Sequence, residues 1–335
     1  MNRKIGILGC GGIAHTHAQA IDGIANAELV GVTDKNFDNA SKFADAYNTK
    51  AYQSYEAMLS DSEIDIISIC TPSGFHQQTA IDALNAKKHV IVEKPMALSV
   101  EGCDAIIDAS VKNDRLVTVI SQMRFADNFI KVKRLIEDGR FGRILSAELS
   151  MKYWRDSEYY SSSSWRGTVE LDGGGALMNQ GIHGVDLMIH LLGEPKVLFG
   201  KTKAILHDIE VEDIAIATLE FENGAQGVIQ ATTCLYPGFS RKLSVYGTDG
   251  YVIMNEDVVE EIMIDKKMTE WVNNSTVNPD SARNPTAMDA ELHRRQIQNL
   301  VNAIDGSEKL YSDVNEGKKA VKLICDIYNK SKENK

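Results

Sequence analysis

The fold is decided by the stretch Lys4–Ala14, which reads KIGILGCGGIA. Its first half is a short apolar run typical of a buried strand, and its second half fits the pattern G-x-G-x-x-G/A. Glycines that directly follow a strand allow a tight turn and let backbone N–H groups approach a pyrophosphate, which the N-terminus of the next helix favours electrostatically. The stretch therefore predicts a dinucleotide-binding turn, with Gly9, Gly11, Gly12 and Ile13 as cofactor contacts.

A carboxylate follows at the distance that such a turn requires. Asp34 lies 20 residues beyond Ala14, at the end of the next apolar run, Glu28–Thr33. There a carboxylate accepts hydrogen bonds from the adenosine ribose hydroxyls of NAD. Asp34 would repel the 2′-phosphate of NADP, and the neighbouring Lys35 offsets part of that repulsion. We therefore expect NAD as the preferred cofactor, with NADP as the alternative.

Outward from this stretch, strand-like and helical patterns alternate as far as Gln122. The further strands are predicted at Glu28–Thr33, Ile64–Cys70, His89–Val92 and Leu116–Ser121, and the helices at Ile13–Ile24, Asn39–Tyr47, Gln77–Ala86 and Val100–Lys112. Alternation of this kind is typical of a parallel sheet with crossover helices on both faces. The sequence thus predicts an α/β fold that begins with a Rossmann domain, a doubly wound parallel sheet, in residues 1–122.

The pattern changes after Gln122, where Ile144–Tyr153 alternates strictly between apolar and polar residues, as a half-exposed strand does. Similar segments are Ile214–Glu222, Gln226–Thr233, Lys242–Tyr246 and Tyr251–Met254, with turn signals at Asn223-Gly224 and Asp249-Gly250 and helical patterns at Phe129–Asp138, Met288–Ile304 and Val314–Asn329. We expect residues 123–335 to form an α+β domain with a large, mostly antiparallel open sheet. This domain would bind substrate, and the free side of its sheet would mediate a homodimer or homotetramer.

The charge balance, the length of the apolar runs and the cysteine spacing indicate which binding partners this protein lacks. The 335 residues carry 36 Lys plus Arg against 47 Asp plus Glu, a net charge of −11, which argues against nucleic-acid binding because that affinity comes from neutralising phosphates. No apolar run reaches the roughly 18 residues of a membrane helix, and the N-terminus shows no signal-peptide pattern, so we expect a cytoplasmic protein with no membrane partner. The five cysteines are scattered without a CxxC pair, which predicts neither disulfides nor a bound metal.

Two clusters follow predicted strands of the first domain. Ligands of an open α/β sheet bind beyond the carboxyl ends of the strands, so Lys94 in Glu93-Lys94-Pro95 is placed to reach a substrate. A plain turn is the alternative explanation. Thr71, Pro72 and His76 follow another strand, where His76 either lines the cofactor groove or caps a helix.

A third cluster, Asp172–Asp186, begins with three glycines and continues as a helical pattern. It places Asn179, His183, Asp186 and His190 on one helical face. We interpret His183 as an acid/base residue, with a core or capping role as the alternative. A metal face made of His183, Asp186 and His190 lacks a fourth ligand and the HExxH pattern.

Together these motifs resemble the Gfo/Idh/MocA oxidoreductases in order and spacing over nearly the whole chain. Trp165-Arg166-Gly167 and the stretch Asp172–Gln180 are similar to a branch of sugar and nucleotide-sugar 3-dehydrogenases. The resemblance implies that Lys94 and His183 face each other across the nicotinamide. The glycine turn, Asp34 and Lys35 are not the only expected cofactor contacts. The others are Thr71, Pro72, His76, Glu93, Lys94 and Gln122.

The sequence thus predicts an NAD(P)-dependent dehydrogenase for a secondary alcohol or ketone of a sugar, polyol or sugar derivative. His183 would act as general base, Lys94 would stabilise the alkoxide, and Asn179 would orient the substrate or His183. Further predicted substrate contacts, with domain-interface packing as the alternative, are Arg124, Tyr153, Trp165 and Arg166. Two rival functions are an NAD-dependent glycosidase that oxidises its sugar transiently and a non-catalytic regulator that binds dinucleotide or sugar.

Two positions depart from the family pattern. Asn179 stands where many members have Asp, and an amide stabilises an imidazolium less strongly than a carboxylate does. Lys87 stands where members usually have glycine, which would cost about 1 kcal/mol if the residue is left-handed.

Overall fold

The computed structural model describes residues 2–277 and 290–333. The chain divides into two compact units, one made of Met1–Gln122 and Met288–Lys318, the other of Met123–Ala287 and Lys319–Lys335. Within the described ranges, no helix combines the length and the apolar character that a membrane crossing needs.

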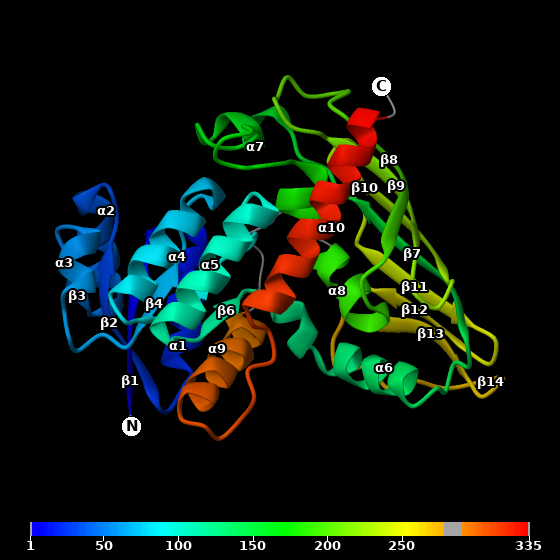
Figure 1. Ribbon diagram of the computed structural model, residues 1–335, viewed down its shortest axis with the longest axis horizontal. Helices are drawn as coiled ribbons and strands as arrows, with labels where there is room; N and C mark the ends of the chain where they lie inside the picture. The colour runs from blue at the N-terminus through cyan, green and yellow to red at the C-terminus, as the bar shows by residue number, and fades with distance from the viewer. Residues whose placement is uncertain (1, 278–289, 334–335) are drawn as a thin grey trace. The chain divides into compact units, whose positions relative to one another are not determined.

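The first unit is built on a parallel sheet, which confirms the predicted Rossmann domain (Figure 1). Among the described residues its strand order is β3-β2-β1-β4-β5-β6. The strands are β1 (Arg3–Leu8), β2 (Ala27–Thr33), β3 (Lys50–Ala51), β4 (Ile66–Ile69), β5 (His89–Val92) and β6 (Val117–Val119). The helices are α1 (Gly12–Asp22), α2 (Phe37–Tyr47), α3 (Tyr55–Leu59), α4 (His76–Asn85), α5 (Val100–Asn113) and α9 (Ala290–Ile304), with a 3₁₀ turn, η1, at Ser73–Phe75.

Strand β1 pairs with β2 on one side and with β4 on the other. The direction in which the chain adds strands to the sheet therefore reverses between β1 and β4. All four residues of β4 are buried, as the continuous apolar run predicts. Ligands of such sheets bind at the carboxyl ends of the strands beside this reversal. The glycine turn after β1 and the loop after β4 therefore lie at the expected binding position.

Helix α9 belongs to the first unit, although the sequence places all of residues 123–335 in the second domain. Ile297, Leu300 and Val301 of α9 are buried in one hydrophobic cluster with Ile5 and Ile21 of β1 and α1. A return of the chain to an earlier unit leaves no signal in the local pattern of α9, which reads as amphipathic in either setting. The predicted start of this helix at Met288 lies outside the described residues.

The second unit is built on a large sheet that is antiparallel except where β7 and β10 pair, as predicted. In the described part of the chain its order is β14-β13-β12-β11-β7-β10-β9-β8. The strands are β7 (Ile144–Lys152), β8 (Lys196–Lys203), β9 (Ile214–Glu220), β10 (Gln226–Thr232), β11 (Lys242–Gly247), β12 (Tyr251–Asn255), β13 (Val258–Ile264) and β14 (Lys267–Met268). The sequence missed β8 and β13, because a bulge or register shift interrupts the pairing of each and breaks its alternation.

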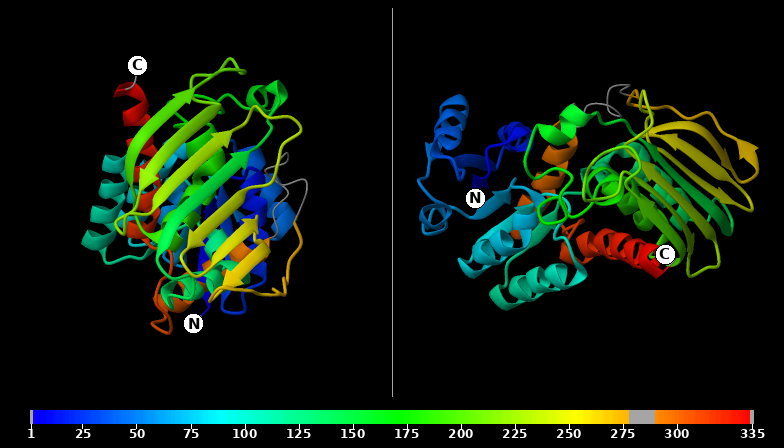
Figure 2. Two further views of the ribbon diagram at one scale, coloured as in Figure 1. Left: turned by 90° about the vertical axis from the view of Figure 1, so that its right-hand side faces the viewer. Right: turned by 90° about the horizontal axis from the view of Figure 1, so that it is seen from above.

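The helices of the second unit pack on one face of the large sheet, and no helix formed by the described residues lies on the other face (Figure 2, left). Ala147, Leu149 and Met151 of β7 are buried on the covered face. The remaining elements are the 3₁₀ turn η2 (Gln122–Phe125), which starts at the unit boundary, α6 (Asp127–Glu137), α7 (Ser157–Ser161), the π-helical segment η3 (Ala176–Gly181), α8 (Ile182–Leu192) and α10 (Val314–Glu333). Helix α10 begins in the first unit and continues into the second.

Candidate active site

The glycine turn after β1 has the shape that a bound pyrophosphate requires. Gly9 has φ +92°, and a Cβ on it would lie 2.8 Å from the carbonyl oxygen of Cys70, so only glycine fits there. A Cβ on Gly11 would meet no atom within 4 Å, so the backbone on that side is open to a ligand. Gly11 is also the N-cap of α1 and brings no side chain to cap the first N–H groups of the helix. These residues fit the diphosphate of NAD, whose negative charge the helix N-terminus favours.

Asp34 directly follows β2 and fastens the glycine turn. Its Oδ2 accepts the backbone N–H of Cys10 at 2.9 Å, and its Oδ1 accepts the N–H of Asn36 at 2.9 Å. The carboxylate is thus held at the rim of the turn, where the ribose of NAD is expected. Lys35, the next residue, is exposed.

His76 links two strand-end loops. The imidazole is buried at the start of α4, with Nδ1 2.7 Å from the carbonyl oxygen of Pro95 and Nε2 2.9 Å from that of Thr71. Burial lowers the pKa of His76. The geometry shows a role beyond the two that the sequence left open, because the ring joins the loop after β4 to the loop after β5.

The Glu93-Lys94-Pro95 segment lies at the carboxyl end of β5, and its glutamate points into the unit. Glu93 is buried, accepts the backbone N–H of Lys94 at 3.1 Å through Oε2, and places Oε1 2.9 Å from Nε2 of His17. Glu93 was predicted to bind the cofactor, whereas these bonds engage its carboxylate with protein groups. Gln122, another predicted contact, is buried at the start of η2.

In the second unit, the predicted substrate residue Arg124 forms a buried ion pair. Its Nε donates to Oδ2 of Asp186 at 2.8 Å and its Nη2 donates to Oδ1 at 2.6 Å. Both side chains are almost completely buried. Because Asp186 lies on α8, three residues beyond His183, the pair fixes the helix that carries His183. Both carboxylate oxygens of Asp186 are engaged with Arg124, which argues against the metal face considered from the sequence.

The helix that carries His183 is not a regular α-helix from its start. Residues 176–181 form the π-helical segment η3, in which Gln180 N–H donates to the carbonyl oxygen of Gly175 at 3.1 Å, and α8 follows from Ile182. The wider turn changes the direction of Asn179 relative to the single face that the sequence predicts. Asn179 Nδ2 donates to Oδ1 of buried Asp172 at 2.6 Å. π-helical turns are rare and are frequent at functional sites.

The glycines before η3 have a structural cause that the sequence did not reveal. A Cβ on Gly175 would lie 2.0 Å from the carbonyl oxygen of Glu212, and one on Gly174 would lie 2.2 Å from the hydroxyl oxygen of Tyr328. The Glu212 carboxylate also accepts the N–H of Gly175 at 3.1 Å, the N–H of Leu177 at 2.8 Å and the Tyr328 hydroxyl at 2.9 Å. Glu212 and Tyr328 thus shape the segment that carries Asn179, and sequence reasoning missed both.

The other predicted substrate residues lie in and near β7 and the segment that follows it. Tyr153 is buried directly after β7, and burial raises the pKa of its hydroxyl. The Arg166 guanidinium lies 4.2 Å from the ring centroid of Tyr159 and 5.6 Å from that of Trp165, and its Nη1 donates to the Tyr159 carbonyl oxygen at 3.1 Å. Trp165 and Arg166 are therefore held together with Tyr159, a residue that the sequence did not single out.

A parallel sheet whose first turn fits a diphosphate, followed by a unit with a large open sheet, defines a class of two-part dinucleotide-dependent α/β enzymes. Residues 3–121 match the model of an oxidoreductase family with an NAD-binding Rossmann fold, and residues 129–253 match that of the GFO/IDH/MocA C-terminal domain. The chain belongs to the Gfo/Idh/MocA family of NAD-binding oxidoreductases, which confirms the resemblance seen in the sequence.

Individual relatives agree with this assignment. The chain is 30% identical to the uncharacterized oxidoreductase YrbE of Bacillus subtilis over 73% of this chain and 71% of the relative. It is 27% identical to a myo-inositol 2-dehydrogenase of Thermotoga maritima over 74% of each chain. The crystal structure of the WlbA dehydrogenase of Bordetella pertussis with NADH and UDP-GlcNAcA matches with a TM-score of 0.88 and 30% identity, covering 100% of this chain and 98% of that one.

Proposed function

We propose that this protein is an NAD-dependent dehydrogenase that interconverts a secondary alcohol and a ketone of a sugar, polyol or sugar derivative. The observation that carries the proposal is the presentation of Lys94 at the carboxyl end of β5, where buried Glu93 accepts the Lys94 N–H and buried His76 contacts the carbonyl oxygen of Pro95. The compounds named for relatives, an inositol in the name of one and a bound nucleotide sugar in the structure of another, support the substrate class.

In the proposed reaction, NAD supplies the nicotinamide that accepts the hydride. His183 takes the proton of the reacting hydroxyl, a kind of assistance typically worth about 10²–10⁴-fold in rate. Lys94 stabilises the oxygen as negative charge develops on it. Asn179, whose amide is oriented by Asp172, positions the substrate or His183.

Substrate contacts are proposed at Tyr153, Trp165 and Arg166. An indole packs well on the apolar face of a sugar, and a guanidinium pairs with a carboxylate or phosphate. For Arg124, the bidentate pair with Asp186 favours a role in holding α8. The substrate contribution of Arg124 would then be indirect.

The catalytic roles are tested with Lys94→Ala and His183→Ala. We expect each to lower kcat by about 10² or more, with NADH affinity changed by no more than about threefold. Turnover is measured as NADH formation with myo-inositol, glucose 6-phosphate and UDP-GlcNAcA, compounds named for relatives. The matched controls are Lys112→Ala, an exposed lysine of the first unit, and His190→Ala at the other end of α8.

Near-full activity in either variant would remove that residue from the mechanism. Glycoside cleavage without net NADH formation would support the glycosidase alternative. NADH binding without turnover of any sugar would support the regulator.

The preference for NAD is proposed to depend on Asp34, because its carboxylate would lie against the 2′-phosphate of NADP. We expect Asp34→Ala to lower the ratio of NAD to NADP activity by about tenfold, the effect of roughly 1.4 kcal/mol. An unchanged ratio would contradict this role.

We propose that the uncovered face of the large sheet forms the interface of a homodimer or homotetramer. Phe199 of β8, Ile216 of β9 and Val228 of β10 lie on this face and are each 42% exposed. Aromatic and aliphatic side chains beside polar ones are typical of subunit interfaces. Sedimentation of Ile216→Asp should show a smaller species than the wild type, and Val111→Asp on α5 serves as the control. A wild-type monomer would contradict the proposal.

A cytoplasmic location is also proposed. All five cysteines are free thiols, as expected in a compartment that keeps them reduced. Cell fractionation checks this location directly.

A further inference from the structure

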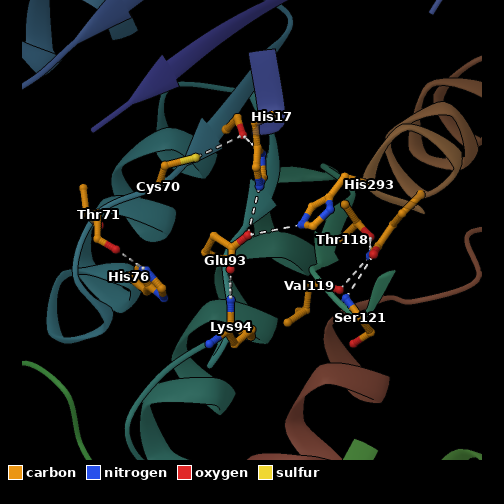
Figure 3. Close-up of polar contacts among 12 residues, drawn as sticks. His17, Cys70, Thr71, His76, Glu93, Lys94, Thr118, Val119, Ser121 and His293 are labelled. Atoms are coloured by element: carbon orange, nitrogen blue, oxygen red, sulfur yellow. Dashed lines mark hydrogen bonds and ion pairs between the residues drawn. The ribbon is translucent and has the colours of Figure 1, made fainter. Parts of the chain in front are cut away.

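A cluster of ionisable side chains is buried directly behind Lys94 in the first unit (Figure 3). His17 of α1 lies with Nδ1 2.8 Å from the hydroxyl oxygen of Ser68 and Nε2 2.9 Å from Oε1 of Glu93. His293 of α9 places Nε2 3.9 Å from the same carboxylate oxygen. Side chains from two helices, α1 and α9, therefore converge on one glutamate.

The cluster is charged despite its burial. His17 is 0% exposed, His293 1% and Glu93 6%. Burial alone raises the pKa of Glu93, but the hydrogen bond from His17 and the charges of His17, His293 and Lys94 outweigh it and lower that pKa below its usual range. For His17, burial lowers the pKa, but Cys70 and Glu93 together raise it to about 10. Removing one partner from such a cluster would leave a buried charge uncompensated, which is costly.

The cluster is joined to the main chain of Lys94. Oε2 of Glu93 accepts the backbone N–H of Lys94 at 3.1 Å, while Oε1 faces the two imidazoles. On the other side, the carbonyl oxygen of Pro95 lies 2.7 Å from Nδ1 of buried His76. The peptide group before Lys94 and the carbonyl group of Pro95 are thus both held by buried side chains.

We propose that His17 and His293, acting through Glu93, are positioning residues that set the main-chain position of Lys94. This inference rests on the proposed role of Lys94 in stabilising the substrate oxygen. A displacement of about 1 Å at a reacting group can cost roughly 10²-fold in rate. A charged network that joins Glu93 to partners in α1, β4 and α9 restrains Lys94 more tightly than one neutral hydrogen bond would.

The same three side chains bring possible metal-ligand atoms within 4.8 Å of one another. The geometry favours hydrogen bonding, since 2.9 Å between Nε2 of His17 and Oε1 of Glu93 is a normal hydrogen-bond length. Metal analysis of the purified protein separates the two arrangements. One equivalent of zinc lost in His17→Ala would overturn the positioning role.

The main experiment is a double-mutant cycle in the full chain with His17→Ala, Lys94→Ala and the double variant. We expect His17→Ala to lower kcat by about 10- to 100-fold, with the sugar KM and the NADH Kd changed by no more than about threefold. In the Lys94→Ala background, His17→Ala should cause no further loss. His17→Gln, whose amide can still donate to Glu93, should recover most of the activity even if the alanine variant folds poorly. The control is His15→Ala, an exposed histidine on the same helix.

A second readout does not require turnover. The acetylation rate of Lys94 by acetic anhydride, followed by mass spectrometry, should change several-fold in His17→Gln and His17→Ala, while that of Lys112 stays constant. Equal losses of kcat in both backgrounds, or unchanged kcat and unchanged labelling in folded His17→Ala, would overturn the positioning role. If Lys94→Ala keeps full activity while labelling responds to His17, the proposed function of Lys94 fails and the positioning network stands.

Discussion

Each unit buries a charged carboxylate beside a predicted catalytic residue, but the two carboxylates have different partners. In the first unit Glu93 adjoins Lys94 and faces His17 and His293. In the second unit Asp186 lies three residues beyond His183 and binds the Arg124 guanidinium through two hydrogen bonds. The pKa of His17 is raised to about 10, so this imidazole loses its proton in alkaline solution, whereas a guanidinium keeps its charge. The support of Lys94 is therefore sensitive to pH, and that of the helix carrying His183 is fixed.

The largest effect on stability is expected from breaking the ion pair between Arg124 and Asp186. Arg124→Met leaves the Asp186 carboxylate buried without its partner, which should lower the free energy of unfolding by about 3–5 kcal/mol. Urea unfolding at neutral pH measures the change. Arg124→Met combined with Asp186→Leu should recover most of the loss, because no charge then remains buried. If Arg124→Met is as stable as the wild type, the ion pair between Arg124 and Asp186 does not stabilise the fold.

The second largest effect is expected in the pH dependence of stability that arises from His17, Glu93 and His293. His17 has its folded-state pKa raised from 6.5 to about 10, so its stabilisation is complete below pH 6.5 and is lost as pH rises toward 10. The groups that face it are Ser68 of β4, Cys70 directly after β4, Glu93 directly after β5 and His293 of α9.

The measurement is the difference in urea midpoint between the wild type and His17→Gln over that range. This difference should shrink with rising pH, while the corresponding difference for Arg124→Met stays level. A level curve for both variants would show that the two clusters respond alike.

A third prediction concerns Asn179, whose side chain lies against another buried carboxylate. Asn179→Asp would place two carboxylates at the 2.6 Å contact with Asp172, so one of them must stay protonated or move. We expect a stability loss of about 1–3 kcal/mol that grows as pH rises, because the raised pKa of the pair favours the protonated form. Thermal unfolding at several pH values checks this expectation, and Asn179→Ala, which adds no charge, is the control.

The smallest effect is expected at Lys87, which lies two residues before β5. Its φ is +64°, the left-handed conformation for which the sequence predicts a cost. Lys87→Gly should remove a strain of about 1 kcal/mol, less what is lost with the 2.8 Å hydrogen bond from Lys87 Nζ to Asn113. A small rise in melting temperature is expected. Lys87→Ala, which keeps the strain and loses the hydrogen bond, should lower it.

Much of the fold could be predicted because its signals are local. The parallel strands are continuous apolar runs, and β7, β9 and β10 alternate regularly, so their bounds fell within a few residues of those observed. Strand β8 could not be predicted, because a bulge at Val197–Phe199 breaks the alternation of apolar and polar residues. The return of α9 to the first unit escaped because it depends on packing between distant segments.

The candidate site divides in the same way. The glycine turn and Asp34 could be predicted from the sequence, because the glycine pattern and the spacing of 20 residues from Ala14 to Asp34 are visible in the sequence itself. The partners of the catalytic candidates come from far along the chain, as with His17 for Glu93 and Tyr328 for the glycines before η3. The π-helical turn at Asn179 escaped because an α-helical period was assumed throughout.

The discontinuous first unit has a consequence for synthesis on the ribosome. The strands of the parallel sheet emerge before the second unit, but Ile297, Leu300 and Val301, which complete the core beside α1, are added only after residues 123–287. Residues 123–287 have all been made by then, so the second unit has its whole large sheet available while the apolar side of α1 still awaits its cover. The nascent chain therefore exposes one incomplete hydrophobic core while residues 123–287 are being made, the condition under which a chaperone that binds apolar surface is of most use.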